Sequence, residues 1–411
     1  MRIIHTADWH LGDRLGRIDR TEDLRRAVER VGELCRRERA DVLLVAGDLF
    51  SELARPDNLR DTIRHWQEVF QHFLTHGGTI ITITGNHDNE NFCQTLTHAM
   101  SLAAPTLGGI GNLVPPGRLY LAAEPSLLRL ASPEGFEVQF LLMPYPTPTR
   151  YLRDEESRKF ASPEEKNRKL ETAFRETMRT MQTHENNRPH LPTILSAHVS
   201  VTGANMGHTL FRMTEVEDIQ LTSEDIAGGF CYVALGHIHK AQALGGLSHV
   251  RYSGSIEKMD LGEKADNKSC VLFVVGPDGL VGEPKVLPLP STNVYEVNVR
   301  NPTEEMTAIA EQYAGAERDL VNLIVEWTAG KDDLETTLRD LEKIFPRWYG
   351  RKLRETSELD DPLVREADAP NRGFEETVRE YVDRELINHS DEERGAILLK
   401  LGELLGTKVD L

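Results

Sequence analysis

The sequence predicts an α/β fold in which buried strands alternate with helices. The short run of residues 41–48 is apolar on both faces, which is typical of a parallel strand covered by helices, and residues 78–84 form a further expected strand. Longer segments lie between such runs, and in the first of them, residues 19–39, apolar residues recur at intervals of three and four, as on a helix that buries one face. In addition, several of the expected strands end in aspartate, asparagine or histidine.

Composition is typical of a globular protein. The 411 residues are 39% hydrophobic and 28% charged, which suggests two or three domains, and no apolar run approaches the roughly 20 residues of a membrane helix. The chain starts without an apolar leader, and its four cysteines form no Cys-x-x-Cys pair, so we expect a cytoplasmic protein with reduced thiols and no membrane contact. The net charge of −18 argues against wrapping nucleic acid by bulk electrostatics, although bound metals, local arginines or a partner could supply positive charge.

We expect four parts along the chain. Residues 1–290 form the large α/β domain, and residues 291–356 form a small β-α-β-α domain without a cluster of metal-ligand residue types. Residues 357–371 are acidic and contain proline, as a linker would, and residues 372–411 contain two amphipathic helices. These two helices either pack back on the chain or bind a partner helix. Other expected helices are 56–76, 91–104, 155–184 with a break near 162, 303–313 and 334–344; other expected strands are 137–143, 193–198, 231–239, 269–275, 286–289, 295–299, 320–326 and 351–354.

Metal-ligand residue types follow the ends of five strands in the large domain. Because the carboxyl ends of strands form the site in open α/β sheets, we expect these side chains to meet in space. The candidate ligands are Asp8, His10, Asp48, Asn86, His198, His237 and His239. Seven oxygen and nitrogen donors are too many for one structural zinc ion, but they suit two divalent ions that share one carboxylate. Mixed imidazole, carboxylate and amide donors favour Mn, Fe or Zn over Mg or Ca.

These residues predict phosphoester hydrolysis. Asp48 is the expected bridging ligand because its strand lies between the others, and two ions can clamp a phosphate and activate a water. His87 follows the ligand Asn86 and is the candidate for the group that faces the scissile phosphate, as a hydrogen-bond donor or as the acid for the leaving group. Asp88 is the candidate for orienting His87.

Three further residues are candidates for binding substrate. Arg14 and Arg17 lie in the loop after His10, where they could contact phosphate. Ser253, in the segment Arg-Tyr-Ser-Gly-Ser, could bring a hydroxyl near a phosphate or could form an ordinary turn of a sheet, and the sequence does not favour one over the other.

The motifs Asp8-x-His10, Gly47-Asp48, Gly85-Asn86-His87-Asp88, His198 and Gly236-His237-x-His239 together resemble the motif set of calcineurin-like metallophosphoesterases. Within that superfamily the chain is similar to SbcD-type DNA repair exonucleases, through His5 to Gly12, Tyr232 to Gln242 and His249 to Ser255. The resemblance implies a four-layer α/β/β/α sandwich with a small DNA-capping domain and a C-terminal helix pair. It also implies a Mn-dependent exonuclease and endonuclease that processes DNA ends and hairpins.

The resemblance further implies ligands and partners. Two manganese ions would be bound, one by Asp8, His10, Asp48 and His239 and the other by Asp48, Asn86, His198 and His237, with His87 as the catalytic histidine. The protein would be a homodimer whose C-terminal helices bind an SMC-like ATPase, SbcC. Relatives from archaea and eukaryotes carry a histidine shortly after the Gly-Asp motif, where this chain has Ser51 and Glu52, so the balance between exonuclease and endonuclease activity stays open.

Two other functions remain as alternatives. A phosphatase or phosphodiesterase on the same fold could act on small substrates, although it would have no evident use for a linker and a helix pair. A catalytically silent scaffold could bind DNA or the ATPase only, but the complete ligand set argues against it.

Overall fold

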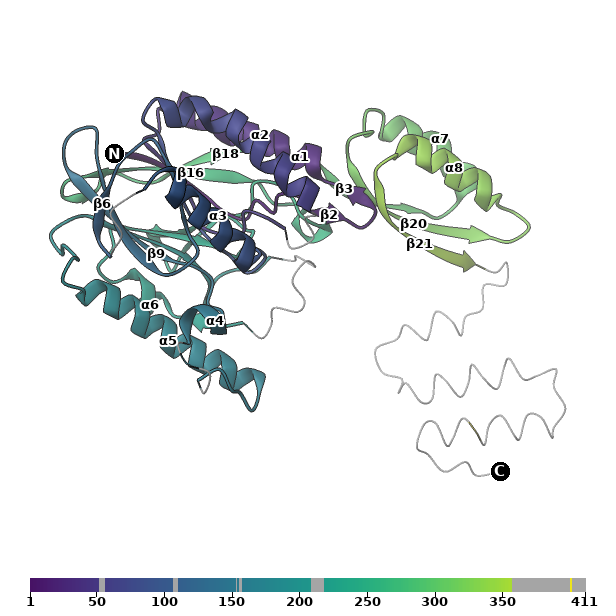
Figure 1. The fold of residues 1–411 in the computed structure, drawn as a ribbon. Helices are drawn as coiled ribbons and strands as arrows, with labels where there is room; N and C mark the ends of the chain where they lie inside the picture. Colours follow the sequence, from purple (N-terminus) through teal and green to yellow (C-terminus); the bar gives the residue numbers. More distant parts are fainter. Residues whose placement is uncertain are drawn as a thin grey trace. The chain divides into compact units, whose positions relative to one another are not determined.

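The computed structural model describes residues 1–51, 56–105, 110–152, 154, 157–207, 218–356 and 400. Its two seven-stranded sheets and flanking helices confirm the predicted α/β fold (Figure 1). Apart from Lys400, the expected linker and C-terminal helices lie outside the described residues. None of the helices within these ranges is long and apolar enough to cross a lipid bilayer.

The first sheet is built by β-α-β units at the start of the chain. Its parallel strands, with β4 between β1 and β5, are β1 (Arg2–Thr6), β4 (Val42–Val45), β5 (Thr79–Ile83) and β7 (Leu119–Ala122). The helices that connect them are α1 (Thr21–Arg37), α2 (Pro56–Thr75) and α3 (Glu90–Ala103). The sheet continues beyond β1 through antiparallel pairing with β16 (Ser269–Gly276), which in turn pairs with β17 (Gly279–Leu280) and β18 (Lys285–Pro288).

The second sheet has the order β14-β15-β13-β10-β9-β8-β6, and β10 pairs in parallel with both β9 and β13. Its strands are β6 (Asn112–Val114), β8 (Ser126–Ala131), β9 (Glu137–Met143), β10 (Thr193–His198), β13 (Tyr232–Gly236), β14 (Gln242–Leu244) and β15 (Leu247–Tyr252). The helices on this half are α4 (Pro148–Tyr151), α5 (Pro163–Thr183) and α6 (Ser223–Ala227). Shorter elements are β2 (Arg14–Leu15), β3 (Ile18–Asp19), β11 (Ser200–Val201), β12 (Gln220–Leu221) and the 3₁₀ helix η2 (Leu261–Glu263).

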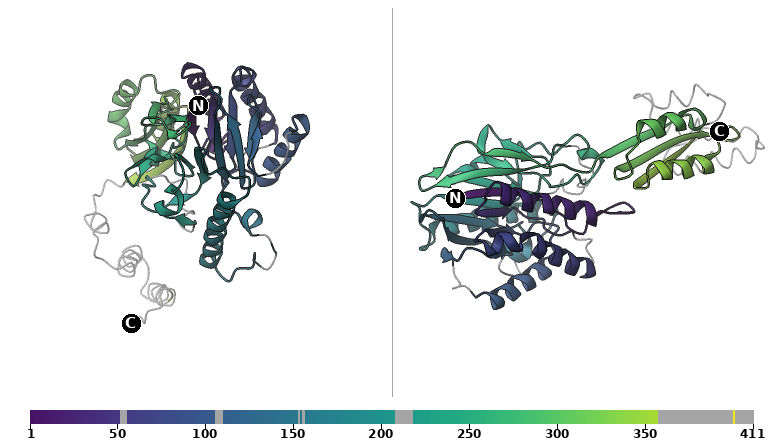
Figure 2. Two further views of the ribbon diagram at one scale, coloured as in Figure 1. Left: turned by 90° about the vertical axis from the view of Figure 1, so that its left-hand side faces the viewer. Right: turned by 90° about the horizontal axis from the view of Figure 1, so that it is seen from above.

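Three apolar clusters divide this domain into four layers. In the cluster between the sheets, Ile3 and Leu44 of the first sheet pack with Phe140 of the second. The outer face of the first sheet packs against α1, α2 and α3, and the outer face of the second packs against α4, α5 and α6 (Figures 1 and 2). Because both faces of each sheet are covered, the central strands are apolar on both sides.

A third, three-stranded sheet follows along the chain and begins at Val294. Its strands are β19 (Val294–Val299), β20 (Leu320–Thr328) and β21 (Trp348–Thr356), in that order, and its helices are α7 (Pro302–Gln312) and α8 (Leu334–Ile344). It has an apolar cluster of its own, in which Val297 and Leu323 pack with Leu341 and Phe345. β19 and β20 pair in parallel over six residues, as a β-α-β connection requires.

Several expectations for elements differ from the structure. The break expected near residue 162 is present, but residues 157–162 are not helical, and α5 begins at Pro163, where Ser162 accepts a hydrogen bond from the Glu165 N–H. The strand expected over residues 231–239 ends at Gly236. The strands β6, β7 and β8 and the hairpin of β14 and β15 were not predicted. Many of their residues are only partly buried, so the sequence lacks the continuous apolar run that marks the central strands.

His5 of β1 points into the core between the two sheets. Its Nδ1 lies 3.1 Å from the Tyr232 hydroxyl and its Nε2 lies 3.2 Å from the Leu235 carbonyl oxygen, so a neutral ring can accept the first hydrogen bond and donate the second. Burial lowers the pKa of His5 to about 3. The unfolded chain takes up this proton near pH 6.5, so the free energy of unfolding should fall as the pH drops from 6.5 toward 3, by at most about 1.4 kcal/mol per pH unit.

A His5→Gln variant should therefore show a shallower loss of stability with acidification than the wild type. Urea unfolding of both proteins at about pH 7, 6 and 5 measures this difference. His190 is exposed, so His190→Gln serves as the control and should keep the wild-type slope. Equal slopes for His5→Gln and the wild type would contradict the assignment of this acid sensitivity to His5.

Candidate metal centre

The predicted ligands lie where the carboxyl ends of both sheets meet. Asp8, Asp48 and Asn86 follow β1, β4 and β5 of the first sheet. On the second sheet, His198 is the last residue of β10, and His237 directly follows β13. Each sheet therefore contributes about half of the site, and contacts across the sheets join the halves.

The backbone turns sharply at these strand ends. Among the described residues, five non-glycine residues have positive φ, and four of them are Asp8 (55°), His10 (46°), Asp48 (52°) and His237 (96°). Such conformations are uncommon for residues with a side chain and gather at functional sites, where surrounding contacts maintain them. Here the Asp48 carbonyl oxygen accepts hydrogen bonds from the backbone N–H groups of Trp9 (2.8 Å) and His10 (3.0 Å), which ties the end of β1 to the end of β4.

The glycines of the motifs allow these segments to approach closely. A Cβ atom on Gly85 would lie 2.0 Å from Asp48 Oδ1, and one on Gly236 would lie 1.9 Å from the Ala46 carbonyl oxygen. Both distances are far below van der Waals contact. The glycine of Gly-Asn-His and that of Gly-His are therefore required by the packing of the site.

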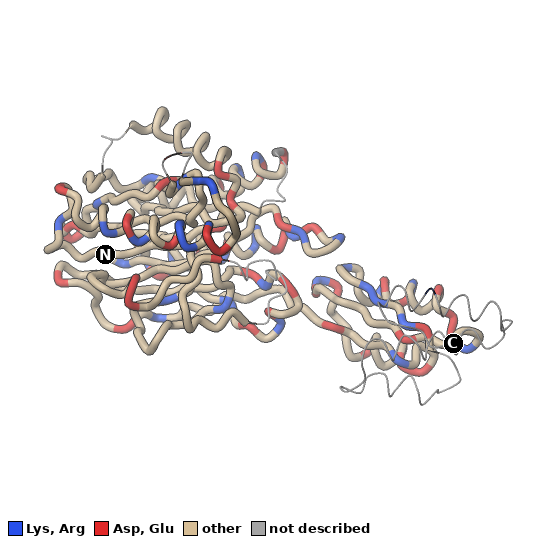
Figure 3. The backbone as a smooth tube through the Cα atoms, turned by 90° about the horizontal axis from the view of Figure 1, so that it is seen from below, with Lys and Arg blue, Asp and Glu red and all other residues tan. Residues whose placement is uncertain are grey.

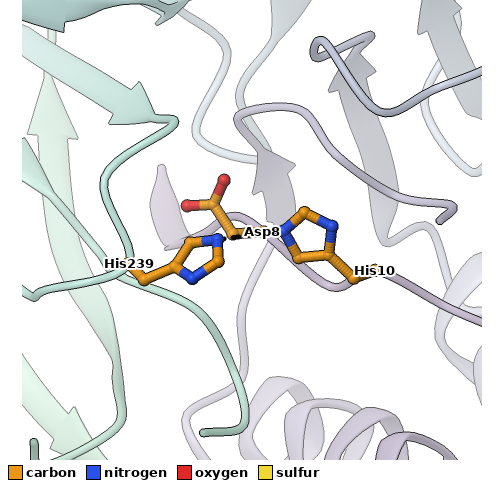
Figure 4. A group of neighbouring side chains, drawn as sticks. All are labelled: Asp8, His10 and His239. Carbon is orange, nitrogen blue, oxygen red and sulfur yellow. Dashed lines mark hydrogen bonds between the residues drawn. The ribbon is translucent and has the colours of Figure 1, made fainter. Parts of the chain in front are cut away.

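Asp8, His10 and His239 form the first group of donors. Their side chains gather at one place although His239 comes from the second sheet (Figure 4). The Nε2 atoms of His10 and His239 are 3.0 Å apart. Asp8 Oδ1 accepts a hydrogen bond from the His237 N–H at 2.9 Å, whereas Asp8 Oδ2 is buried and has no hydrogen-bond partner in the described part of the chain.

Asn86, His198 and His237 form the second group. Asn86 Oδ1 lies 3.1 Å from His198 Nε2 and 3.1 Å from His237 Nδ1. Donors bound side by side to a metal at about 2.1 Å are about 3 Å apart, so the spacing in both groups fits divalent cations. The cluster of aspartate and histidine donors is thus a candidate divalent-metal site.

Asp48 lies between the two groups. Its Oδ2 is 3.2 Å from His198 Nε2 and 3.7 Å from His10 Nε2, and its Oδ1 accepts a hydrogen bond from the His87 N–H at 2.9 Å. Burial alone would raise the pKa of Asp48, but the imidazoles of His198 and His10 hold that pKa well below its ordinary value. The carboxylate is therefore ionised in a fully buried position, which favours a bound cation.

In three of these histidines, the ring nitrogen that faces away from its donor group lies close to an oxygen of the protein. His198 Nδ1 lies 2.7 Å from the Ala46 carbonyl oxygen, His237 Nε2 lies 2.8 Å from Asp218 Oδ2, and His239 Nδ1 lies 2.6 Å from Glu263 Oε1. At His198 and His239, the hydrogen bond at Nδ1 leaves the lone pair on Nε2, which is the form that binds a metal.

His87 is more exposed than the buried donors. Six of the predicted ligands are at most 3% exposed, whereas Asn86 and His87 are half-buried. The ring centroids of His87 and His10 are 5.0 Å apart. His87 therefore lies next to the first group, and its Nε2 is buried there.

Asp88 has a different position from the one expected. Its Oδ1 accepts from the Phe50 N–H at 2.8 Å, and its Oδ2 accepts from the N–H groups of Gly85 (2.8 Å) and Leu49 (3.3 Å). Both carboxylate oxygens are thus turned to the backbone, which favours a structural role for Asp88 over the expected one of orienting the His87 ring. The carboxylate instead joins the loop after β4 to the loop after β5.

An Asp88→Ala variant should lose about 3 kcal/mol of unfolding free energy, because three buried N–H groups lose their acceptor. Its affinity for divalent metal should also fall, since both loops carry donors. Asp88→Asn keeps one acceptor oxygen and should show a smaller loss of stability. Urea unfolding of the metal-free proteins measures the stability effect, and an unchanged midpoint for Asp88→Ala would contradict it.

The three candidates for substrate binding differ in position. Arg14 is exposed, and its guanidinium donates to the Arg17 carbonyl oxygen. The Arg17 guanidinium stacks 4.0 Å from the Trp348 ring centroid and donates to the carbonyl oxygens of Pro346 and Trp348, so part of it is used within the protein. Ser253 is fully buried and its hydroxyl donates to the Gly254 carbonyl oxygen, so the structure favours an ordinary turn there over a contact to phosphate.

The sequence did not reveal the residues that surround the donors. Asp218, Tyr145, Glu263 and Lys268 lie outside the recognised motifs, and no periodic pattern marks them. Tyr145 donates to Asp218 at 2.6 Å, and its ring stacks on that of His237. Only the folded chain brings these groups next to the histidines.

Ser51 follows the Gly47-Asp48 motif by three residues. Its side chain is buried, and its hydroxyl donates a hydrogen bond to Asp13 Oδ1 at 3.0 Å. This hydrogen bond joins Ser51 to the loop that follows His10, so the hydroxyl donates to the protein itself.

Comparison with known proteins identifies a family and several relatives. The family model for calcineurin-like phosphoesterases matches residues 1–241. The SbcD subunit of the nuclease SbcCD from Escherichia coli (strain K12) is 26% identical over 369 residues, covering 84% of this chain and 83% of that protein. The subunit of the same name from Bacillus subtilis (strain 168) is 25% identical over 292 residues, covering 67% of each, and that of Rhodobacter capsulatus is 28% identical over 262 residues, covering 62% of each.

Proposed function

The chain belongs to the calcineurin-like phosphoesterase family, and we propose that it is the manganese-dependent nuclease subunit of a DNA repair complex. It is a metal-dependent phosphodiester hydrolase. The similarity to subunits named as nucleases extends over 84% of the chain, well beyond residues 1–241, which supports DNA as the substrate.

The proposal of two ions rests on the position of Asp48 between the two donor groups. The first ion would be held by Asp8, His10, Asp48 and His239, and the second by Asp48, Asn86, His198 and His237. Asp48 Oδ2 faces histidines of both groups, as a shared ligand must. Mixed nitrogen and oxygen donors suit Mn²⁺. When bound, two such ions supply Lewis-acid chemistry that clamps the phosphodiester and lowers the pKa of the attacking water.

His87 is proposed to act on the phosphate directly. Its backbone N–H donates a hydrogen bond to Asp48 Oδ1 at 2.9 Å. This bond keeps His87 beside the proposed shared ligand. The residue is half-buried, and its Nε2 is buried beside the donor groups. The ring would donate a hydrogen bond to the phosphate or a proton to the leaving oxygen.

Charge does not by itself identify the DNA-binding surface. Figure 3 shows lysine and arginine interleaved with aspartate and glutamate along the tube. With a net charge of −18, the metal ions and a partner would have to supply much of the attraction for phosphate.

Digestion of linear duplex and hairpin DNA with Mn²⁺ tests the substrate, with bis-p-nitrophenyl phosphate assayed beside it. We expect all three to be cleaved, and cleavage to stop after chelation of the metal. Cleavage of the small diester alone would favour the alternative of a small-molecule phosphodiesterase. Failure to cleave any of them, with metal bound, would favour the silent scaffold. Sedimentation of the same preparation tests the proposed homodimer.

We expect deletion of residues 362–411 to leave Mn²⁺-dependent nuclease activity intact and to abolish co-purification with the SMC-like ATPase. The reason is the apolar stripe that the sequence places in these residues, which suits a partner helix. Leu401→Asp is the matched point variant, since it introduces one charge into that stripe and should weaken binding as well. Unchanged co-purification of the deletion variant would contradict the proposed role of this segment.

A further inference from the structure

Glu263 is a buried carboxylate next to a proposed metal ligand. It is 1% exposed and lies at the end of η2, 24 residues after His239 along the chain. Its Oε1 lies 2.6 Å from His239 Nδ1, while His239 Nε2 faces His10 Nε2 at 3.0 Å. The carboxylate and the donor group thus occupy opposite sides of the same imidazole.

Lys268 holds the other oxygen of this carboxylate. Its Nζ donates to Glu263 Oε2 at 2.6 Å, to Ser255 Oγ at 2.8 Å and to the His239 carbonyl oxygen at 3.2 Å. Glu263 Oε2 also accepts from the Met259 N–H at 3.0 Å. Lys268 is 2% exposed, so the two buried charges compensate each other, and the orientation of the carboxylate is determined from several sides.

We propose that Glu263 is a positioning residue that sets the affinity of the first metal ion through His239, and that Lys268 keeps its carboxylate in place. Glu263 accepts the Nδ1–H of His239, which leaves the lone pair on Nε2 and fixes the plane of the ring. This inference rests on the proposed two-metal site. Removing such an outer carboxylate typically costs about 10- to 100-fold in metal affinity.

Glu257 is a matched control in the same segment. It is also 1% exposed, but its carboxylate accepts from the N–H groups of Lys258 and Thr292 and from the Thr292 hydroxyl, and within the described residues it contacts no proposed ligand. A change at Glu257 removes a buried carboxylate from the same loop without removing the contact to His239.

Calorimetric titration of the metal-free full-length protein with Mn²⁺ tests the inference. The wild type should bind two ions, Glu263→Gln should weaken one of them by about 10- to 100-fold and spare the other, and Glu257→Gln should leave both unchanged. Equal affinities for Glu263→Gln and the wild type, or an equal loss in Glu257→Gln, would overturn it. A wild type that binds two ions but cleaves no DNA would contradict the proposed nuclease and leave this inference standing.

Glu263→Gln leaves Lys268 buried without its nearest counter-charge, since Asp266 Oδ2 is 3.9 Å away, so a second variant separates folding from positioning. In Glu263→Gln with Lys268→Met both charges are removed together. The melting temperature of this metal-free double variant should return toward that of the wild type, while the affinity for one Mn²⁺ ion stays low. Recovery of the affinity along with the melting temperature would show that Glu263 acts only through stability, and the proposal would fall.

Discussion

An Asp48→Ala variant is expected to lose both metal ions and to lower phosphodiester cleavage at least about 1,000-fold, or about 4 kcal/mol in the activation free energy. The reason is the position of its Oδ2, 3.2 Å from His198 Nε2 and 3.7 Å from His10 Nε2, where one carboxylate serves both donor groups. Loss of any other proposed ligand should affect mainly one ion. Elemental analysis of metals per chain, beside cleavage of a DNA hairpin and of bis-p-nitrophenyl phosphate, measures both effects.

Asp57→Ala is the control for Asp48→Ala, because the side chain of Asp57 is 89% exposed at the start of α2 and lies outside the proposed site. Its metal content and activity should equal those of the wild type. Retention of two ions per chain by Asp48→Ala would rule out the shared-ligand assignment. Loss of activity with full metal content would instead give Asp48 a role in the chemistry alone.

A His87→Ala variant should keep its metal content and lower the rate of DNA cleavage by about 100- to 10,000-fold, the range typical of a group that transfers a proton in the transition state. The side chains of His10, Asp48 and His87 also lie close enough together to hold one ion, so metal content separates a ligand from a proton donor. If His87 protonates the leaving oxygen, the defect should shrink on bis-p-nitrophenyl phosphate, because p-nitrophenolate leaves without a proton. If it only stabilises charge on the phosphate, both substrates should suffer alike.

The exposed His76 on the segment after α2 provides the control for His87. His76→Ala should equal the wild type in metal content and in cleavage of both substrates. Loss of one ion in His87→Ala would make His87 a ligand, and wild-type rates on DNA would remove it from the mechanism altogether.

Much of the fold was predictable because its central strands are buried on both faces. β4 is a continuous apolar run, β5 combines isoleucine with threonine and is buried throughout, and α1 between β1 and β4 has a regular apolar face. The edge strands β6 and β7 and the hairpin of β14 and β15 are half-buried and short, so their sequence pattern is weak. Pairing between distant segments, such as β1 with β16, leaves no local signal at all.

The candidate site was predictable where its residues end strands, because the chain must turn there and glycine, aspartate, asparagine and histidine mark the turns. The same reasoning did not anticipate the backbone contacts of Asp88 and did not distinguish the two alternatives for Ser253. Both lie beside strand ends, but their polar atoms are used by the backbone, Asp88 by three N–H groups and Ser253 by the Gly254 carbonyl oxygen. Residue type and spacing do not specify which way a side chain points at a turn.

Local periodicity and short motifs were enough to predict the alternation of strands and helices, the family and which strand ends carry candidate donors. The folded chain was needed to show that the donors come from two facing sheets, that Asp48 Oδ2 lies between both groups, and that Asp218 and Glu263 stand behind two of the histidines. The physical reason is that these contacts join residues far apart in the chain, and their geometry depends on how two separately formed sheets pack against one another.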